Sequence, residues 1–330
     1  LADLDPHSMF LTAEEYENKK NSPLSNFAGL GLQITMSQGV AQVVAPLDNS
    51  PAAVAGLRPG DLIVDVNRTP IYGMTLNQAM AEIKGGPPGS KVELLIIREG
   101  EDPFTAIAKR EDIETPAVTW SIRQTEGYIR IPLFLDSTTE QIKQAVSDIK
   151  ASIGESFGGL IIDLRNTPGG SIQAGIEVAD LFLHDGEIVS VRNNNGDIAE
   201  TFTTNLNDLL DGKPIVLLAD RGTAGAAEIV TGAIKDNNRG VVVGSNTFGL
   251  GSRQKIIPVD DDGYVQITVG YFYSPSGYTI EGLGIEPEVN IEPSRVIIQE
   301  SRFPRRREAT LRGALDVGDD EDENEGSVGW

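Results

Sequence analysis

Strand and helix patterns alternate along the chain from about residue 120 to residue 290. Short apolar runs predict strands at 127–132, 159–164, 215–218, 241–243 and 264–269. Apolar residues at helical spacing predict helices at 137–153 and 171–183, and a third helix follows the strand at 215–218. Strands that alternate with amphipathic helices are typical of a layered α/β core, which we expect over residues 113–300.

Residues 26–112 have a different pattern, which predicts a compact β-rich module. Its predicted strands begin at 29–34 and continue at 40–44, 62–66 and 92–98, with helices at 50–57 and 75–84. In the second helix, Leu76 and Met80 share a face that could line a groove, while Ala79 and Ile83 turn to the core. The alternative is that all four are core residues. Residues 111–119, with Pro116, are interpreted as a linker.

The two ends of the chain have separate compositions. Thr12, followed by Glu14 and Glu15, predicts a helix start, and residues 1–25 are expected to be the remnant of a larger N-terminal helical region. Residues 301–330 are first rich in arginine and then acidic, so we expect a disordered, solvated tail. Neutralisation of the arginines by the acidic block is the alternative.

Composition limits the possible functions. The chain has 330 residues with 49 acidic and 27 basic side chains, and its net charge of -22 argues against nucleic acid or an anionic membrane as partner. Without cysteine there is no disulfide, thiolate metal site or cysteine nucleophile. The only histidines, His7 and His184, are far apart in sequence, so neither a metal site nor a cofactor is expected.

Residues 220–254 are the most distinctive part of the core. A strand runs into a turn of small residues, DRGTAGAAE, and a second glycine loop, TFGLG, follows at 247–251. Glycine turns let another backbone approach closely and direct amide groups towards whatever binds there. Two such loops close together in sequence indicate a site.

The β-rich module resembles a PDZ domain of the type found in bacterial proteases. The resemblance rests on GLGL at 29–32 and on SPAAVAGLRPGDLIVDVN at 50–67. It implies that peptide or protein C-termini bind at the loop of Gly29, Leu30, Gly31 and Leu32, and add to the sheet as a strand. Leu76 and Met80 would form the wall of this groove, and an apolar wall favours apolar C-terminal side chains.

Five motifs together extend the resemblance to nearly the whole chain. They are LDPHS at 4–8, DLRNTPGG at 163–170, DRGTAGAAEI at 220–229, GSNTFGLGSRQ at 244–254 and YSPSGYTIEGLGIEPEV at 273–289. In this combination the chain is similar to the C-terminal processing peptidases, also called tail-specific proteases. The resemblance implies a crotonase- or Clp-like α/β core with an inserted PDZ domain. It also implies a Ser-Lys dyad, a periplasmic or otherwise extracytoplasmic location, possible membrane association, and oligomers.

The motifs that should carry the dyad lack both reactive side chains. In the family the nucleophile is the serine of G-[ST]-A-S-A-x-E and the base is the lysine of F-G-K-G, and these positions are Gly225 and Leu250 here. Gln254 matches the glutamine that orients the lysine. The backbone of Gly169, Gly170 and Ala226 would still form an oxyanion pocket.

We therefore expect a pseudoprotease that binds peptides through its PDZ domain and acts as a scaffold or regulator, for instance of an active protease. The alternative is an active serine-type endopeptidase with a relocated nucleophile, or one completed by a partner. Nearby candidates for such a relocated pair are Thr223, Thr247, Ser252, Ser171 and Lys255. If residues 252–259 form a strand, Lys255 points away from Gln254.

Overall fold

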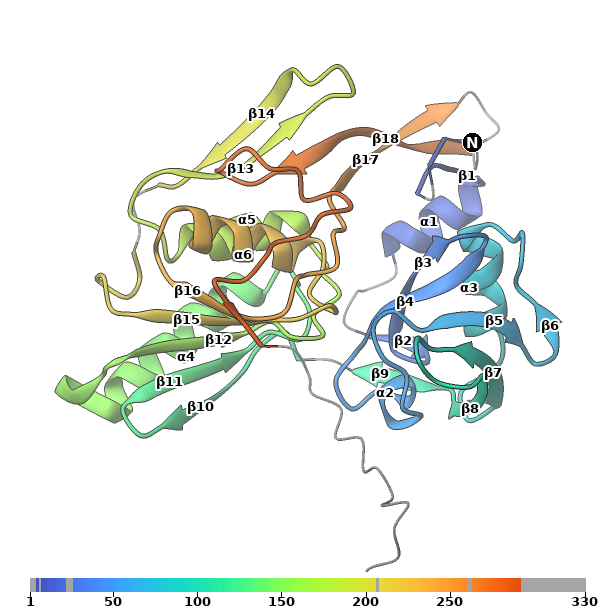
Figure 1. The fold of residues 1–330 in the computed structure, drawn as a ribbon, viewed down its shortest axis with the longest axis horizontal. Helices are drawn as coiled ribbons and strands as arrows, with labels where there is room; N and C mark the ends of the chain where they lie inside the picture. The colour runs from blue at the N-terminus through green and yellow to red at the C-terminus, as the bar shows by residue number, and fades with distance from the viewer. Residues whose placement is uncertain are drawn as a thin grey trace, which may run out of the picture. The chain divides into compact units, whose positions relative to one another are not determined.

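The computed structural model describes residues 4–5, 7–21, 26–114, 116–205, 208–259 and 263–291, all within one compact unit (Figure 1). This unit contains two large hydrophobic clusters, one drawn from residues 30–108 and the other from residues 129–285. The predicted arginine-rich and acidic tail at 301–330 lies outside the described residues. No helix in the described ranges is both long and apolar enough to cross a bilayer.

The N-terminal cluster is built on an antiparallel sheet. Its strands are β3 (Leu32–Ser37), β4 (Val40–Pro46), β5 (Leu62–Val66), β6 (Thr69–Pro70), β7 (Lys91–Ile97) and β8 (Phe104–Lys109). Their order is β3-β4-β5-β7-β8, with β6 paired to β5. Because β3 is the edge strand of this order, one side of its backbone has no strand partner among the described residues.

Two predictions at the edges of this module are wrong. The predicted strand at 29–34 is divided, because β2 (Asn26–Gly29) ends before β3 begins at Leu32. The predicted linker at 111–119 contains β9 (Glu111–Glu114), which pairs antiparallel with β2. That pairing joins segments more than eighty residues apart, so the local sequence pattern does not reveal it.

Gly31 produces the break between β2 and β3. Its φ of +65° lies in the left-handed region, and a Cβ at this position would overlap the Cβ of Ser50. Ser50 is the N-cap of the short helix α2 (Pro51–Val54). The carbonyls of Leu30 and Gly31 accept hydrogen bonds from the amides of Ala52 (2.9 Å) and Leu47 (2.8 Å). The loop is thus fixed against α2 by backbone contacts that only glycine permits.

The second helix of the module, α3 (Leu76–Lys84), begins with a capping box between Thr75 and Gln78. Ala79 and Ile83 are buried, as predicted, whereas Leu76 and Met80 are half-buried at the rim of the cluster. The prediction that two apolar residues of this helix turn to the core and two remain accessible is confirmed. The alternative of four core residues is wrong.

The second cluster lies around a six-stranded sheet in the order β10-β11-β12-β15-β16-β19. The strands are β10 (Thr119–Arg123), β11 (Glu126–Arg130), β12 (Gly159–Asp163), β15 (Ile215–Ala219), β16 (Val241–Gly244) and β19 (Val289–Asn290). All neighbours are parallel except β10 and β11, which form a hairpin. Its helices are α4 (Thr138–Ile153), with the short 3-10 turn Gly154–Ser156, α5 (Ile172–Asp180) and α6 (Ala226–Asp236).

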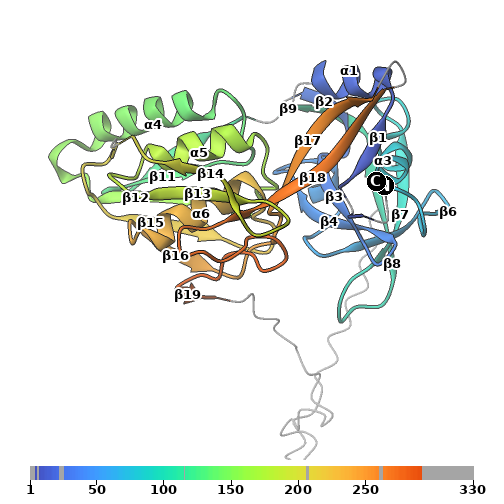
Figure 2. The ribbon, with the colours of Figure 1, turned by 90° about the horizontal axis from the view of Figure 1, so that it is seen from above.

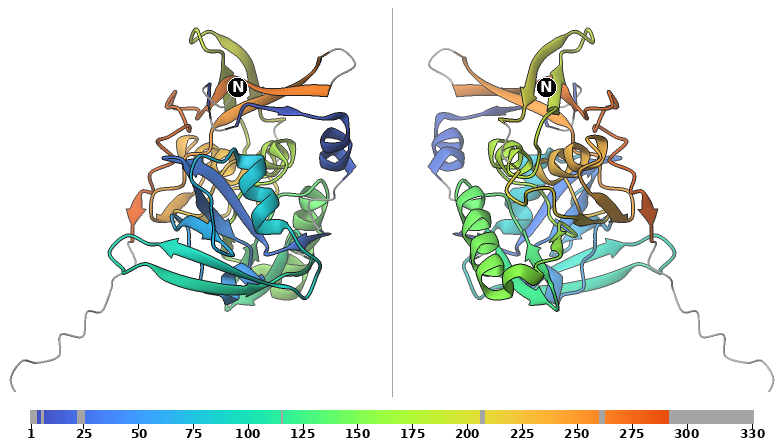
Figure 3. Two further views of the ribbon diagram at one scale, coloured as in Figure 1. Left: turned by 90° about the vertical axis from the view of Figure 1, so that its right-hand side faces the viewer. Right: turned by 90° about the vertical axis from the view of Figure 1, so that its left-hand side faces the viewer.

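A further antiparallel sheet faces the helices α5 and α6 from the other side (Figure 1). It consists of β1 (Met9–Leu11), β13 (Glu187–Arg192), β14 (Ile198–Thr203), β17 (Ser252–Val259) and β18 (Gly263–Tyr273). β18 extends beyond the predicted 264–269 and pairs with β1, β13 and β17. Figure 2 shows α4 and α5 side by side, and Figure 3 shows β1 alongside the β17–β18 pair. The mixed α/β class is confirmed.

A distant contact limits one helix, and a local cap begins another. The predicted helix at 171–183 stops at Asp180, because the carbonyl of Leu181 accepts the amide of Leu209 (2.7 Å) instead of continuing the helix. At the N-terminus, α1 (Ala13–Asn21) has the predicted cap: the amide of Glu15 donates to the Thr12 hydroxyl (3.2 Å), and the Glu15 carboxylate accepts the amide of Thr12 (2.8 Å).

The two clusters are joined by an ion pair. Arg130 on β11 donates to Asp48, which lies between β4 and α2, at 2.8 and 3.0 Å. The same guanidinium donates to the hydroxyl of Thr167 (2.7 Å). A small apolar cluster of Leu47, Ile113 and Leu133 also lies at this junction.

We predict that Gly31→Ala destabilises the protein by about 3 kcal/mol, because the new Cβ adds overlap with Ser50 to the strain of a left-handed residue. Gly56→Ala is the matched control, because Gly56 has a φ of +82° but no atom within 4 Å of its Cβ position. It should cost only about 1 kcal/mol. Denaturant unfolding measures both, and equal costs would contradict this account of the loop.

Candidate functional site

The turn between β15 and α6 is fixed by its polar side chains. The Asp220 carboxylate accepts the amides of Asn166 (2.8 Å) and Gly222 (2.9 Å). The hydroxyl of Thr223 donates to the carbonyl of Leu164 (2.8 Å) and accepts the amide of Asp220 (2.9 Å). Burial raises the pKa of Asp220, and the two amide hydrogen bonds act against that rise. These bonds hold the turn against the segment that follows β12.

Gly225 occupies a position with space for a side chain. Its φ of 55° and ψ of -116° are rarely adopted by L-residues. A Cβ at Gly225 would nevertheless meet no atom closer than 3.8 Å, and its nearest neighbours would be the Cα of Gly169 and Cδ2 of Leu250. The structure therefore brings together the two positions that the sequence marks as a degenerate dyad.

The glycine pair at 169–170 lies beside the start of α6. The Cβ position of Gly169 is 3.5 Å from the amide nitrogen of Ala226, the first residue of the helix. An amide at this helix position has no partner within the helix. The amides of Gly169 and Gly170 donate to no acceptor among the residues that the structure describes. Gly170 itself packs against the backbone of Phe134.

The side-chain amide of Gln254 is hydrogen-bonded at one of its two ends. Its Nε2 donates to the hydroxyls of Ser252 (3.1 Å) and Thr268 (2.8 Å). Its Oε1 is buried and has no hydrogen-bond partner in the described part of the chain. Exchanging the two ends of the amide would leave the other end without a partner.

The LDPHS segment is linked to Gln254 by a series of hydrogen bonds. The hydroxyl of Ser8 donates to Asp5 and accepts the amide of Thr268 (3.2 Å). Partial burial acts to raise the pKa of Asp5, but hydrogen bonds from Ser8, His7 and Thr268 outweigh it and hold the pKa below the usual value. The N-terminal motif thus reaches Gln254 through a single threonine on β18. Residues 260 positions apart make this contact, so spacing in the sequence gives no signal of it.

Glu228 is the one fully buried carboxylate that joins both glycine loops. Its oxygens accept the amides of Gly225 (3.0 Å), Gly249 (2.7 Å) and Leu250 (2.7 Å), and also a short hydrogen bond from the Thr247 hydroxyl. Burial raises its pKa to about 7, although the four hydrogen bonds favour the carboxylate. Sequence reasoning missed this residue. The available signal was its place three residues after Gly225, where a glutamate caps a helix.

The hydroxyls proposed for a relocated dyad are already engaged in the fold. Thr223 and Thr247 are buried and hydrogen-bonded as described above. Ser171 is the N-cap of α5 and accepts the amide of Ala174 (3.3 Å), and Ser252 accepts from Gln254. Lys255 is exposed on β17, next to Gln254, whose side chain is half-buried. Lys255 makes no hydrogen bond to any of these hydroxyls in the described part of the chain.

The candidate peptide groove runs along β3 and α3. The side chains of Leu30 and Leu32 are buried in the module, so the loop at 29–32 presents its backbone. The amides of Leu30 and Gly31 have no acceptor among the described residues. Leu76 and Met80 lie half-buried on the helix that contacts β3. The helix and the strand that carry the predicted groove residues are therefore neighbours in the structure.

We predict that Gln254→Met leaves the stability unchanged, because the removal of a buried acceptor without a partner offsets the loss of the two hydrogen bonds that Nε2 donates. Gln266→Met on the same strand pair is the control. Gln266 donates to the carbonyl of His7 (3.1 Å), so its loss should cost about 1 kcal/mol. Thermal unfolding distinguishes the two variants. An equal loss of stability would count against a Gln254 Oε1 without a hydrogen-bond partner.

We also predict that Glu228→Gln destabilises the protein by about 2–4 kcal/mol, because the amide NH2 would face backbone donors. The raised pKa has a second consequence. Since the folded state binds this proton more tightly than the unfolded state, the stabilisation is complete below about pH 4.5 and is lost as the pH rises through about 7.

Urea unfolding between pH 5 and pH 8 measures this effect. The stability of the natural chain should fall across that range, and the fall should be smaller in the Glu228→Gln variant. Glu140→Gln is the control, because Glu140 is exposed and pairs only with Lys143. It should change neither the stability nor its pH dependence. An unchanged slope in Glu228→Gln would assign the pH dependence to other groups.

Comparison with known proteins gives consistent matches over the whole chain. Residues 125–291 match the model of peptidase family S41, and residues 42–98 match that of the PDZ domain. The carboxy-terminal-processing protease of Bartonella bacilliformis is 36% identical over 332 residues, which cover 100% of this chain and 76% of that protein. The carboxyl-terminal-processing protease of Synechocystis is 34% identical over 326 residues, covering 96% and 74%.

A solved structure extends the match to three dimensions. The photosystem II D1 C-terminal processing protease superposes with a TM-score of 0.80 at 30% identity, covering 88% of this chain and 78% of the other. The resemblance stated from the motifs is confirmed, as is the fold that it implied. This chain belongs to the S41 peptidase family, among the carboxy-terminal-processing proteases that carry a PDZ domain.

Proposed function

We propose that this chain is a pseudoprotease, which binds the C-termini of peptides or proteins through its PDZ domain and does not cleave them. The observation that carries the proposal is the pair Gly225 and Leu250. The two positions lie side by side, and Glu228 accepts the backbone amides of both. Serine-type proteolysis requires an oxygen nucleophile and a base within hydrogen-bond reach, and these positions supply neither.

The environment of Gln254 favours a site that has lost a lysine over a site that never contained one. Its free Oε1 is a buried acceptor directed by Thr268 and Ser252. A lysine amine at position 250 would be the natural donor for it. With leucine there, the buried amine and its desolvation cost are gone, but the acceptor is left over.

Binding requires only groups that the chain still has. The amides of Leu30 and Gly31 can hold a terminal carboxylate, and the open edge of β3 can pair with the residues that precede it. Leu76 and Met80 would form the wall of this groove, and an apolar wall favours apolar C-terminal side chains. Such a protein would act as a scaffold or regulator, possible partners being an active protease or copies of itself, outside the cytoplasm as the family resemblance implies.

Restoring the dyad tests the proposal. The natural chain should not cleave an unstructured substrate that ends in apolar residues. Gly225→Ser combined with Leu250→Lys should cleave it and react with a serine-directed fluorophosphonate probe, because the two adjacent positions would then supply a nucleophile and a base. We expect turnover at least about a hundredfold above background.

The matched control is Gly225→Ala with Leu250→Lys, which has the base without the nucleophile and should remain inactive. Turnover by the natural chain that survives repeated purification would refute the pseudoprotease. In that case the labelled residue, identified by mass spectrometry, would show whether Thr223, Ser252 or another hydroxyl is the nucleophile.

A further inference from the structure

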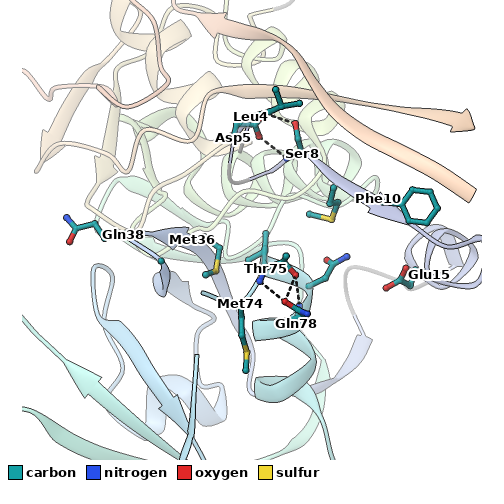
Figure 4. Close-up of a pocket in the computed structure, with 14 residues that line it drawn as sticks. Leu4, Asp5, Ser8, Phe10, Glu15, Met36, Gln38, Met74, Thr75 and Gln78 are labelled. Carbon is teal, nitrogen blue, oxygen red and sulfur yellow. Dashed lines mark hydrogen bonds between the residues drawn. The ribbon is translucent and has the colours of Figure 1, made fainter. Parts of the chain in front are cut away.

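A cavity of about 640 Å³ lies where the N-terminal segment meets the PDZ module (Figure 4). Its apolar lining comes from both sides. Leu4, Met9 and Phe10 belong to the N-terminal segment, and Met36, Met74 and Leu76 belong to the module. Figure 4 shows Leu4 and Phe10 across the cavity from Met36 and Met74. Leu4 and Phe10 are largely exposed, at 64% and 43%, so apolar surface is available to a ligand.

The cavity is lined in part by the two elements that flank the candidate peptide groove. Met36 is near the far end of β3, and Leu76 is the first residue of α3, so the cavity opens at the end of the groove opposite to the loop at 30–31. A peptide that pairs antiparallel with β3 advances one residue for each residue of the strand. If its terminal residue lies beside Leu32, the residue beside Met36 is four positions upstream, and the next ones enter the cavity.

The chemistry of the lining defines what fits there. Methionine side chains are flexible and polarisable, so they adapt to apolar groups of different shapes. The charged residues that the structure describes in the lining are Asp5 and Glu15, and both are acidic. An apolar side chain in a neutral or basic sequence suits this surface, whereas an acidic segment would be repelled.

We propose that this cavity is a second specificity subsite, which binds an apolar side chain five to seven residues upstream of the ligand's C-terminus. The proposal rests on the proposed PDZ function and adds a recognition element to it. The occupant is the upstream part of the same client tail whose carboxylate is held at Leu30 and Gly31. The ligand therefore has two apolar side chains that anchor it, one at its C-terminus and one five to seven residues upstream. The segment between and around them is not acidic.

Three fluorescein-labelled peptides test this by fluorescence anisotropy with the full chain. The first has ten residues, rich in serine and glycine, ends in Val-Ala-Leu and carries leucine as the sixth residue from the C-terminus. The second has serine at that place, and the third is the terminal tetrapeptide alone. We expect the first to bind about tenfold more tightly than the second, as for one partly buried leucine.

The double substitution Leu4→Ser with Phe10→Ser should abolish this preference without changing the affinity for the tetrapeptide, because both side chains lie outside the module. Val54→Ser is the control, since Val54 is 81% exposed and does not line the cavity. It should keep the tenfold preference.

The outcomes separate the subsite from the groove. If the tetrapeptide binds but the two ten-residue peptides bind equally, the subsite is refuted and the PDZ function stands. The same holds if the preference survives the substitution of Leu4 and Phe10. If no peptide binds, or if amidation of the C-terminus has no effect on binding, the proposed PDZ function fails and the subsite fails with it.

Discussion

The buried carboxylate of Glu228 is the constraint on which the rest of the site depends. A fully buried carboxylate is tolerated only when its oxygens are hydrogen-bonded, and here the partners come from both glycine loops: Gly225 on one side, Thr247, Gly249 and Leu250 on the other. Any change that separates the loops would leave this group without partners. The geometry of the two loops is therefore required for folding, whether or not chemistry takes place between them.

This explains how a protease frame can persist without its reactive side chains. Glycine at 225 relieves the strain that a φ of 55° would impose on serine, and leucine at 250 removes a buried amine. Neither change disturbs the bonds to Glu228, because those bonds use the backbone amides of the two residues. Gln254 is the exception, since its free acceptor has no remaining partner. The site thus retains the hydrogen bonds to Glu228, which stabilise the fold, and the free acceptor of Gln254, which does not.

The sequence predicted the elements that local patterns determine and failed where a distant contact decides. The amphipathic pattern located α4 almost to the residue, and the motifs identified the positions 225 and 250 that the structure brings together. By contrast, the end of α5 depends on a hydrogen bond from Leu209, and β9 exists because it pairs with β2. The hydrogen bond between Thr268 and Ser8 also joins residues that are far apart in the sequence. Periodicity carries no information on such partners.

The hydrogen bond between Thr268 and Ser8 connects the proposed ligand cavity with the site around positions 225 and 250. Asp5 and Ser8 line the cavity at the end of the peptide groove, and Ser8 reaches Gln254 through Thr268. A ligand in the cavity would therefore touch the same segment that positions the former orienting glutamine. In a chain with a lysine at 250, that arrangement could make the base sensitive to the ligand. With leucine at 250 the hydrogen-bonded series ends at a Gln254 oxygen that has no partner among the described residues. In the pseudoprotease that we propose, ligand binding would therefore act on no base, and recognition would be the part of the family's function that the chain has kept.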